Sequence, residues 1–186
     1  STQQTATMPI EFKLNGQTVV GRPDELIIET ARRHGVAIPH LCYRKGRRPD
    51  GNCRACVVEI KGERVLAPSC CRAPAAGMEV TSNSDRAVRS QKMVVELLAS
   101  DVPERVYKLD SELDTWKRKL GIGKPRFPAR EQPAADLSHP AMAVNLDACI
   151  NCGLCVRACR EVQHNDVIGM AYRGHGSKVV FDFDQD

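Results

Sequence analysis

The chain has 186 residues, of which 42% are hydrophobic, 4% aromatic and 27% charged, with 27 Lys and Arg against 23 Asp and Glu. That length suits one ordinary domain or two small ones, and a formal net charge of +4 is too small to indicate a nucleic-acid partner. No apolar run approaches the roughly 18 residues that a membrane span requires, so we expect no membrane attachment.

The first 82 residues predict a small mixed sheet with one helix. Residues 10–22 alternate apolar and polar side chains around an Asn-Gly turn, which is the pattern of a β-hairpin. Residues 22–39 carry a helical apolar stripe, with Asp24 as its expected N-cap and Gly35 as its expected end. After a loop rich in Gly, Pro and Arg, we expect three short strands, in residues 56–60, 64–71 and 77–82. This order of elements indicates a β-grasp domain over residues 1–82.

Residues 83–121 predict a helical connector. One helix is expected to start at a Ser84 cap and run to residue 100, and another to run from a Ser111 cap to a Gly121 stop. The Pro-rich residues 122–141 then indicate an extended linker. A further unit is expected over residues 142–186, and its last stretch, VVFDFDQD, has the pattern of an interrupted strand and loop. The fold class is therefore α+β.

Nine cysteines fall into two groups. Their content, about one residue in twenty, is below the roughly 8–10% of a disulfide scaffold. The N-terminal STQQTATMP has neither basic residues nor an apolar core, so we expect no signal peptide. These features favour the cytoplasm, where clustered cysteines are more often metal ligands than disulfides. The groups are Cys42, Cys53, Cys56, Cys70 and Cys71, and Cys149, Cys152, Cys155 and Cys159.

The first group has the spacing Cys42-x10-Cys53-x2-Cys56-x13-Cys70. Thiolates bind soft metals and iron–sulfur clusters, and loop glycines let backbone N–H groups point at sulfur, which stabilises a reduced cluster. A structural zinc site usually shows a second C-x2-C pair or a His pair. We therefore expect these four cysteines to hold a 2Fe–2S cluster, with zinc or disulfides as the alternatives.

The second group, Cys149-x2-Cys152-x2-Cys155-x3-Cys159, is a bacterial ferredoxin run, although Arg160 replaces the usual proline. In two-cluster proteins the fourth cysteine of such a run ligates the other cluster. We therefore expect Cys149, Cys152 and Cys155 to bind one 4Fe–4S cluster and Cys159 to bind a second. No partner run follows, so we expect a truncated half of a two-cluster domain. A ligand from elsewhere, or an empty or zinc-loaded site, are the alternatives.

The first spacing resembles the 2Fe–2S domain of three related families: the large iron–sulfur subunit of complex I, iron-only and NAD-reducing hydrogenases, and the α subunit of NAD-dependent formate dehydrogenase. The resemblance implies the same four 2Fe–2S ligands and leaves Cys71 as a spare. Complex I and hydrogenase relatives normally add a His-x3-Cys-x2-Cys-x5-Cys site, but residues 72–148 contain no cysteine. The stretch DLSHPAMAVNLDACINCGLCVRACREVQHNDVIGMAYRG is most similar to formate dehydrogenase α subunits.

This resemblance implies an electron relay without a catalytic site of its own. Electrons would pass between a molybdopterin domain that oxidises formate and a subunit that binds FMN and NAD. A diaphorase-type subunit of an NAD-linked hydrogenase, or a complex I-like subunit, is the alternative. Exposed arginines flank the first cysteine group, and they indicate a docking site for an acidic partner, a means of raising the cluster potential, or a solvated basic loop: Arg44, Arg47, Arg48 and Arg54.

Overall fold

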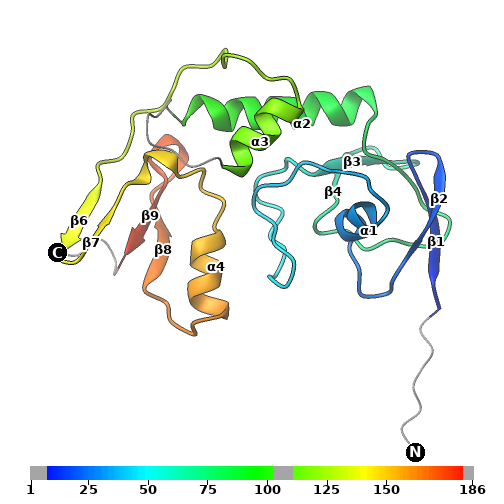
Figure 1. Cartoon of the computed structure of the whole chain (residues 1–186), viewed down its shortest axis with the longest axis horizontal. Coiled ribbons are helices and arrows are strands. Elements are labelled where there is room, and N and C mark those ends of the chain that lie inside the picture. Colours follow the sequence, from blue (N-terminus) through cyan, green and yellow to red (C-terminus); the bar gives the residue numbers. More distant parts are fainter. Residues whose placement is uncertain (1–7, 103–110, 182–186) are drawn as a thin grey trace, which may run out of the picture. The chain divides into compact units, whose positions relative to one another are not determined.

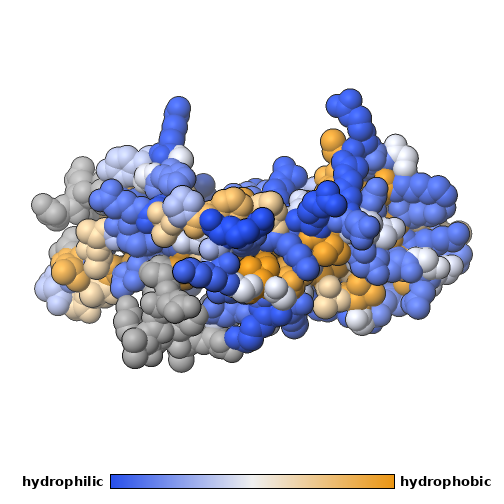
Figure 2. All heavy atoms as spheres, turned by 90° about the horizontal axis from the view of Figure 1, so that it is seen from above, coloured by the Kyte–Doolittle hydropathy of each residue, from blue (hydrophilic) through white to orange (hydrophobic). Residues whose placement is uncertain are grey.

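The computed structural model describes residues 8–102 and 111–181. The chain divides into two compact units. Unit 1 contains the residues up to Lys45 together with Pro49–Gln91, and unit 2 contains Gly46–Arg48 together with the residues from Lys92 onward. No helix among the described residues is both long and apolar enough to cross a bilayer. On the face shown in Figure 2, hydrophilic residues (blue) cover most of the surface, and apolar residues (orange) form smaller areas between them.

Unit 1 is built on a five-stranded mixed sheet with the order β2-β1-β5-β3-β4; Figure 1 labels four of these strands and the helix α1 (Ile27–Arg33). β1 pairs antiparallel with β2 and parallel with β5, whereas β3 pairs antiparallel with both β5 and β4. The strands are β1 (Ile10–Leu14), β2 (Gln17–Gly21), β3 (Val57–Ile60), β4 (Ala67–Pro68) and β5 (Glu79–Thr81). The predicted hairpin, three further strands and single helix are all present, which confirms the α+β fold expected of a β-grasp.

Helix α1 (Ile27–Arg33) packs its apolar stripe against this sheet. The core contains Ile27, Ile28 and Ala31 from the helix, together with side chains that alternate inward along the strands. Those strand residues are Phe12, Leu14, Val19, Val58, Ile60 and Val80. The helix ends where predicted, before Gly35, whose φ of 76° lies in the left-handed region that favours glycine.

The start of α1 differs from the expectation. The N-cap is Leu26 and not Asp24. The carboxylate of Glu29 accepts a hydrogen bond from the Leu26 backbone N–H at 3.3 Å, so an acidic residue inside the first turn satisfies this amide from within the helix. The predicted Ser84 cap is confirmed, because its Oγ accepts a hydrogen bond from the Ala87 N–H at 3.2 Å, ahead of α2 (Asp85–Ser100).

Unit 2 contains helices and two short hairpins. In α3 (Glu112–Lys119) the predicted Ser111 cap accepts a hydrogen bond from the Asp114 N–H at 3.1 Å. The remaining elements are β6 (Asp136–His139), β7 (Met142–Val144), the 3-10 helix η1 (Leu146–Ala148), α4 (Leu154–Glu161), β8 (Ile168–Ala171), the 3-10 helix η2 (Gly174–Gly176) and β9 (Lys178–Phe181). β8 and β9 form an antiparallel hairpin. The part of VVFDFDQD beyond Phe181 lies outside the described residues.

Hydrogen bonds hold the Pro-rich segment against the rest of unit 2. Arg126 donates from Nε and Nη2 to the two carboxylate oxygens of Glu96, at 2.8 and 2.7 Å. Further along, the Arg130 N–H and the Gln132 side chain bind Asp101. The end of this segment differs from the predicted linker, because β6 pairs with β7 across a turn that starts at Pro140.

Candidate iron–sulfur centres

The first cysteine group lies on the long connection between α1 and β3 and on the residues that follow β4. Arg54, between Cys53 and Cys56, has a φ of 58°, and Gly51 has a φ of 65°. An L-residue rarely adopts this left-handed conformation, and here it curls the backbone so that amide groups face the sulfur atoms. The Cys53 N–H donates to Cys42 Sγ at 3.4 Å, and the Ala55 N–H donates to Cys53 Sγ at 3.5 Å.

Four sulfur atoms of this group lie within reach of one another. The side chains of Cys53 and then Cys70 hydrogen-bond to Cys42 and hold the pKa of its thiol far below the usual range, against the opposing effect of burial. Cys70 lowers the pKa of Cys56 in the same way. Conversely, the neighbouring Cys42 raises the pKa values of both Cys53 and Cys70. These side-chain contacts link the four sulfurs from Cys53 through Cys42 and Cys70 to Cys56, and a thiolate is the form that binds iron.

Cys71 differs from the other four cysteines of this group in its exposure to solvent. Cys42, Cys56 and Cys70 are almost completely buried, and Cys53 is half-buried. Cys71 is exposed, although its Sγ lies 3.6 Å from that of Cys70. Across residues 8–102 and 111–181, no three His, Cys, Asp or Glu side chains converge to hold a single metal ion. A 2Fe–2S cluster instead needs two thiolates on each of two irons, and four adjacent sulfurs with N–H donors fit that requirement.

The second cysteine group surrounds the start of α4. Cys149 follows η1, and the left-handed residues Asn151 and Gly153, with φ of 53° and 69°, wrap the chain between the cysteines. The Asn151 N–H donates to Cys149 Sγ at 3.4 Å. Desolvation raises the pKa of Cys155, and the nearby Cys152 and Cys149 raise it further. Cys149 and Cys152 thus lie near enough to Cys155 to act on it electrostatically, and the binding of one 4Fe–4S cluster by these three residues stays a prediction.

Cys159 has a hydrogen-bond partner different from that of Cys149 in the same group. It is buried near the end of α4, and its thiol donates to the Asn165 carbonyl at 2.8 Å. Within the same helix, the buried Arg157 donates to the carbonyls of Gly153 and Cys152, at 3.4 and 3.3 Å. The hydrogen bond of the Cys159 thiol to a backbone carbonyl separates its surroundings from those of Cys149, whose Sγ accepts from the Asn151 N–H.

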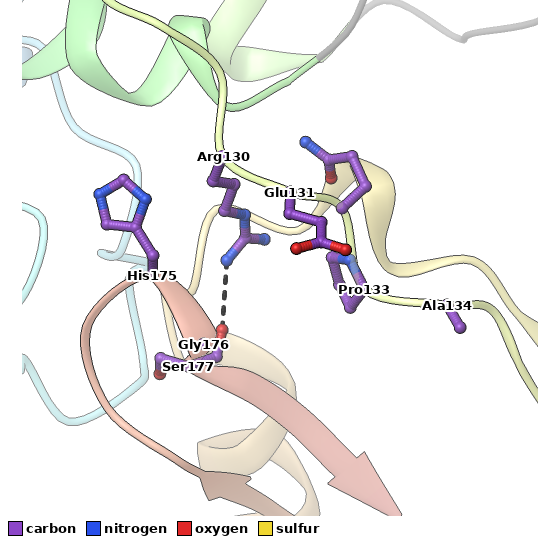
Figure 3. A pocket seen from close by; sticks show the side chains of 8 residues that line it. Arg130, Glu131, Pro133, Ala134, His175, Gly176 and Ser177 are labelled. Carbon is purple, nitrogen blue, oxygen red and sulfur yellow. Dashed lines mark hydrogen bonds between the residues drawn. The ribbon is translucent and has the colours of Figure 1, made fainter.

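Nothing in the sequence indicates the role of Arg130. This residue of the Pro-rich segment is only 7% exposed, and its guanidinium donates to the carbonyls of Cys149 and Ser177, at 3.3 and 3.2 Å. It lines a cavity of about 390 Å³ together with Glu131, His175 and their neighbours (Figure 3). A buried arginine thus anchors the first ligand of the second group to the β8–β9 hairpin. In the sequence, Arg130 stands in a segment whose composition predicts a linker, which gives no reason to expect a buried side chain.

Two family models match the two cysteine groups. A model described as a 2Fe–2S iron–sulfur cluster binding domain matches residues 7–85, and one described as a 4Fe–4S binding domain matches residues 142–161. The first match contains Cys42, Cys53, Cys56 and Cys70, and the second contains all four cysteines of the second group. The chain thus carries a 2Fe–2S and a 4Fe–4S binding domain, and the assignment of individual cysteines as cluster ligands within them stays a prediction.

Known proteins of three kinds are similar over nearly the whole chain. A subunit of the NADH-quinone oxidoreductase of Rhizobium meliloti (strain 1021) is 30% identical over 92% of this chain, which spans 21% of that protein. "Putative formate dehydrogenase YrhE" of Bacillus subtilis (strain 168) is 24% identical over 93% of the chain, which spans 18% of it. The chain therefore spans about a fifth of the length of these curated relatives.

A solved structure extends the similarity to a third kind of protein. A chain in the crystal structure of an NAD⁺-reducing [NiFe]-hydrogenase in the H₂-reduced state matches with a TM-score of 0.82 and 27% identity, over 92% of this chain and 74% of that one. The cysteine geometry, the two domain matches and these relatives agree. The chain is therefore an iron–sulfur electron-transfer region related to those of complex I large subunits, NAD-reducing hydrogenases and formate dehydrogenase homologues.

Proposed function

We propose that the chain relays electrons in an NAD-dependent formate dehydrogenase, between a molybdopterin site that oxidises formate and a subunit that binds FMN and NAD. The observation that carries this proposal is the gap between the cysteine groups. Residues 72–148 contain no cysteine, so they cannot supply the further 4Fe–4S site that complex I and hydrogenase relatives normally have there. The similarity to a putative formate dehydrogenase supports the same choice.

In this proposal the cysteines hold the redox centres and the backbone sets their surroundings. Cys42, Cys53, Cys56 and Cys70 would hold a 2Fe–2S cluster, and Cys149, Cys152 and Cys155 would hold three corners of a 4Fe–4S cluster. Each bound cluster supplies one-electron chemistry. The N–H donors to the sulfurs of Cys42, Cys53 and Cys149 would stabilise the more negative, reduced state.

Two features of the second group require other parts of the parent protein. The fourth ligand of the first 4Fe–4S cluster and the remaining ligands of a cluster on Cys159 would come from a further ferredoxin run, in the same polypeptide or in another subunit. The molybdopterin and FMN would likewise belong to other domains or subunits, and not to this chain. We place the complex in the cytoplasm, because clustered cysteines that serve as cluster ligands suit a reducing compartment.

An NAD-linked hydrogenase is the second candidate. The observation that favours it is the match to the NAD⁺-reducing [NiFe]-hydrogenase chain, with a TM-score of 0.82 and 74% of that chain covered. In such an enzyme this chain would be a diaphorase-type iron–sulfur subunit. The same cysteines would then carry electrons that come from hydrogen and not from formate.

The native complex distinguishes the two candidates directly. An affinity tag on this chain would retrieve the assembled complex under anaerobic conditions, and NAD⁺ reduction would be followed with formate or with hydrogen as the donor. The formate proposal predicts formate-dependent NADH formation and molybdenum or tungsten in the complex. Hydrogen-dependent NADH formation with nickel in the complex would replace it by the hydrogenase. A complex that oxidises NADH with quinone and uses neither donor would overturn both.

A further inference from the structure

The net charge of the chain is concentrated beside the first cysteine group. Residues 44–54 contain five cations and one carboxylate, a net charge of +4, which equals the formal charge of the entire chain. The other 22 cations are balanced by 22 carboxylates. A single short loop therefore carries the whole charge excess of an otherwise neutral protein, and this loop also contains Cys53.

The structure places three of these cations next to two cluster ligands in unit 1. Arg44 and Lys45 follow Cys42, and Arg54 follows Cys53. All three side chains are exposed. The hydrogen bond from the Cys53 N–H to Cys42 Sγ, at 3.4 Å, brings the two ends of the loop together, so the three cations belong to chain positions beside the same two cysteines. We call Arg44, Lys45 and Arg54 the basic patch.

We propose that the basic patch is the docking surface for an acidic face of the redox protein that exchanges electrons with the first cluster. The proposal rests on the electron relay described above. Exposed charge of one sign raises the local concentration of an oppositely charged partner and speeds its association. Electron exchange needs close approach to the cluster, and the patch sits at Cys53, the half-buried member of the four cysteines.

A protein partner fits this patch better than a nucleic acid does. Residues 44–54 contain no aromatic side chain on which a base could stack. The rest of the chain has no excess of cations with which to follow a phosphate backbone. The patch is therefore small and local, as suits the acidic rim of a folded partner.

The test compares two variants of the iron-loaded chain that have equal net charge. The patch variant is Arg44→Gln, Lys45→Gln, Arg54→Gln. The control variant is Lys13→Gln, Lys61→Gln, Arg64→Gln, which removes three exposed cations from β1 and from the turn after β3. Lys61 gives up its ion pair with Glu79, at 3.0 Å, in this variant. Binding of fluorescein-labelled poly-L-glutamate is measured by fluorescence anisotropy at low and at physiological salt.

The expected result is a difference between variants that carry the same total charge. At about 20 mM salt we expect the patch variant to lose about tenfold in affinity for poly-L-glutamate and the control to lose less than about twofold, with all affinities falling steeply by about 150 mM salt. Equal losses in the two variants would overturn the proposal, because net charge alone would then explain the binding. Tighter binding of duplex DNA than of poly-L-glutamate at matched charge would reassign the patch to a nucleic acid.

A second readout locates the effect at the cluster. One electron passes from the reduced chain to ferricyanide, which becomes ferrocyanide, and no proton is transferred. Loss of the low-temperature paramagnetic signal of the reduced 2Fe–2S cluster gives the rate. For anionic ferricyanide we expect about a tenfold slower reaction in the patch variant, and for cationic hexaammineruthenium(III) an equal or faster one. If both oxidants slow together, the substitutions have damaged the site and the docking assignment fails.

Iron analysis keeps the two proposals distinguishable. A patch variant that retains about two irons per chain but loses poly-L-glutamate binding supports the docking surface. A wild-type chain without iron would refute the electron relay itself. A loaded wild-type chain whose reaction with ferricyanide is independent of salt would refute the docking surface and leave the relay intact.

Discussion

Gln91 joins helix α2 to the strand that follows Cys56, one of the proposed cluster ligands. Its side chain is only 2% exposed, and Nε2 donates to the carbonyls of Val57 and Ser82, at 2.9 and 3.0 Å. The paired register of β3 and β5 ends at Glu59 and Thr81, so both carbonyls lie beyond that ladder. One amide group therefore satisfies two backbone acceptors in the interior of unit 1.

Two substitutions of similar size remove this donor. Gln91→Met has no polar group, and Gln91→Glu replaces the NH₂ group by an oxygen that faces the two carbonyls. A buried carbonyl without a donor costs about 1–3 kcal/mol, so we expect Gln91→Met to lower the free energy of unfolding by about 2–4 kcal/mol. Gln91→Glu should cost at least as much, because it also buries a carboxylate.

Thermal unfolding of the iron-loaded chain measures this loss. For a unit of this size, about 2–4 kcal/mol corresponds to a decrease in Tm of about 10–20 °C. The visible absorption of the cluster should disappear in the same transition as the far-ultraviolet circular dichroism of the sheet. Gln17→Glu, at an exposed position of β2, is the matched control and should stay within about 0.5 kcal/mol of the wild type. A Gln91→Met variant as stable as this control would refute the reasoning.

Three further predictions concern the ligands, the buried arginine and a carboxylate. Cys70→Ser should reduce iron to a small fraction of about two per chain, whereas Cys71→Ser, at the exposed neighbour, should keep it; equal loss in both would contradict the assignment. Arg130→Met should destabilise unit 2 by about 2–3 kcal/mol, because the carbonyls of Cys149 and Ser177 lose a buried donor, and Arg130→Lys should recover part of this in thermal unfolding. The Arg33 guanidinium, with help from Thr30, lowers the pKa of Glu25 from 4.5 to about 2. The stabilisation by Glu25 is therefore present above about pH 5 and is lost as the pH falls toward 2; after allowance for the partly exposed Arg33 it amounts to about 1 kcal/mol. Unfolding by denaturant should show a larger stability deficit of Glu25→Gln relative to the wild type at pH 7 than at pH 3, and an equal deficit at both would contradict this.

Local signals in the sequence predicted the first unit well. The Asn15-Gly16 turn has positive φ at both residues, 50° and 81°, as a two-residue hairpin requires. Ser84, Ser111 and Gly35 act where predicted because caps and left-handed stops depend on a few adjacent residues. The cysteine spacing identified both groups because C-x2-C pairs and ferredoxin runs are recognisable from a few neighbouring residues.

Long-range contacts account for what the sequence did not predict. The Asn15 side chain accepts a hydrogen bond from the Ser82 N–H at 2.8 Å, across 67 residues. Gln91 and Arg130 owe their roles to carbonyls on distant elements, and nothing in their neighbouring residues indicates this. The sequence did not predict β6, which lies within the predicted linker. Its partner strand lies beyond Pro140, and a periodic pattern of four residues is too short to recognise. The helix α1 starts at a Leu26 N-cap, whose N–H donates to Glu29, and not at the predicted Asp24.

The measurement that tests the central claim most directly is the count of iron and acid-labile sulfide per chain after anaerobic purification, with paramagnetic resonance of the reduced protein. The account predicts about two irons and two sulfides on Cys42, Cys53, Cys56 and Cys70, rising to about six irons if the 4Fe–4S cluster on Cys149, Cys152 and Cys155 finds a fourth ligand. A chain that contains no iron, or that contains zinc in its place, would contradict the assignment of these cysteines to electron transfer.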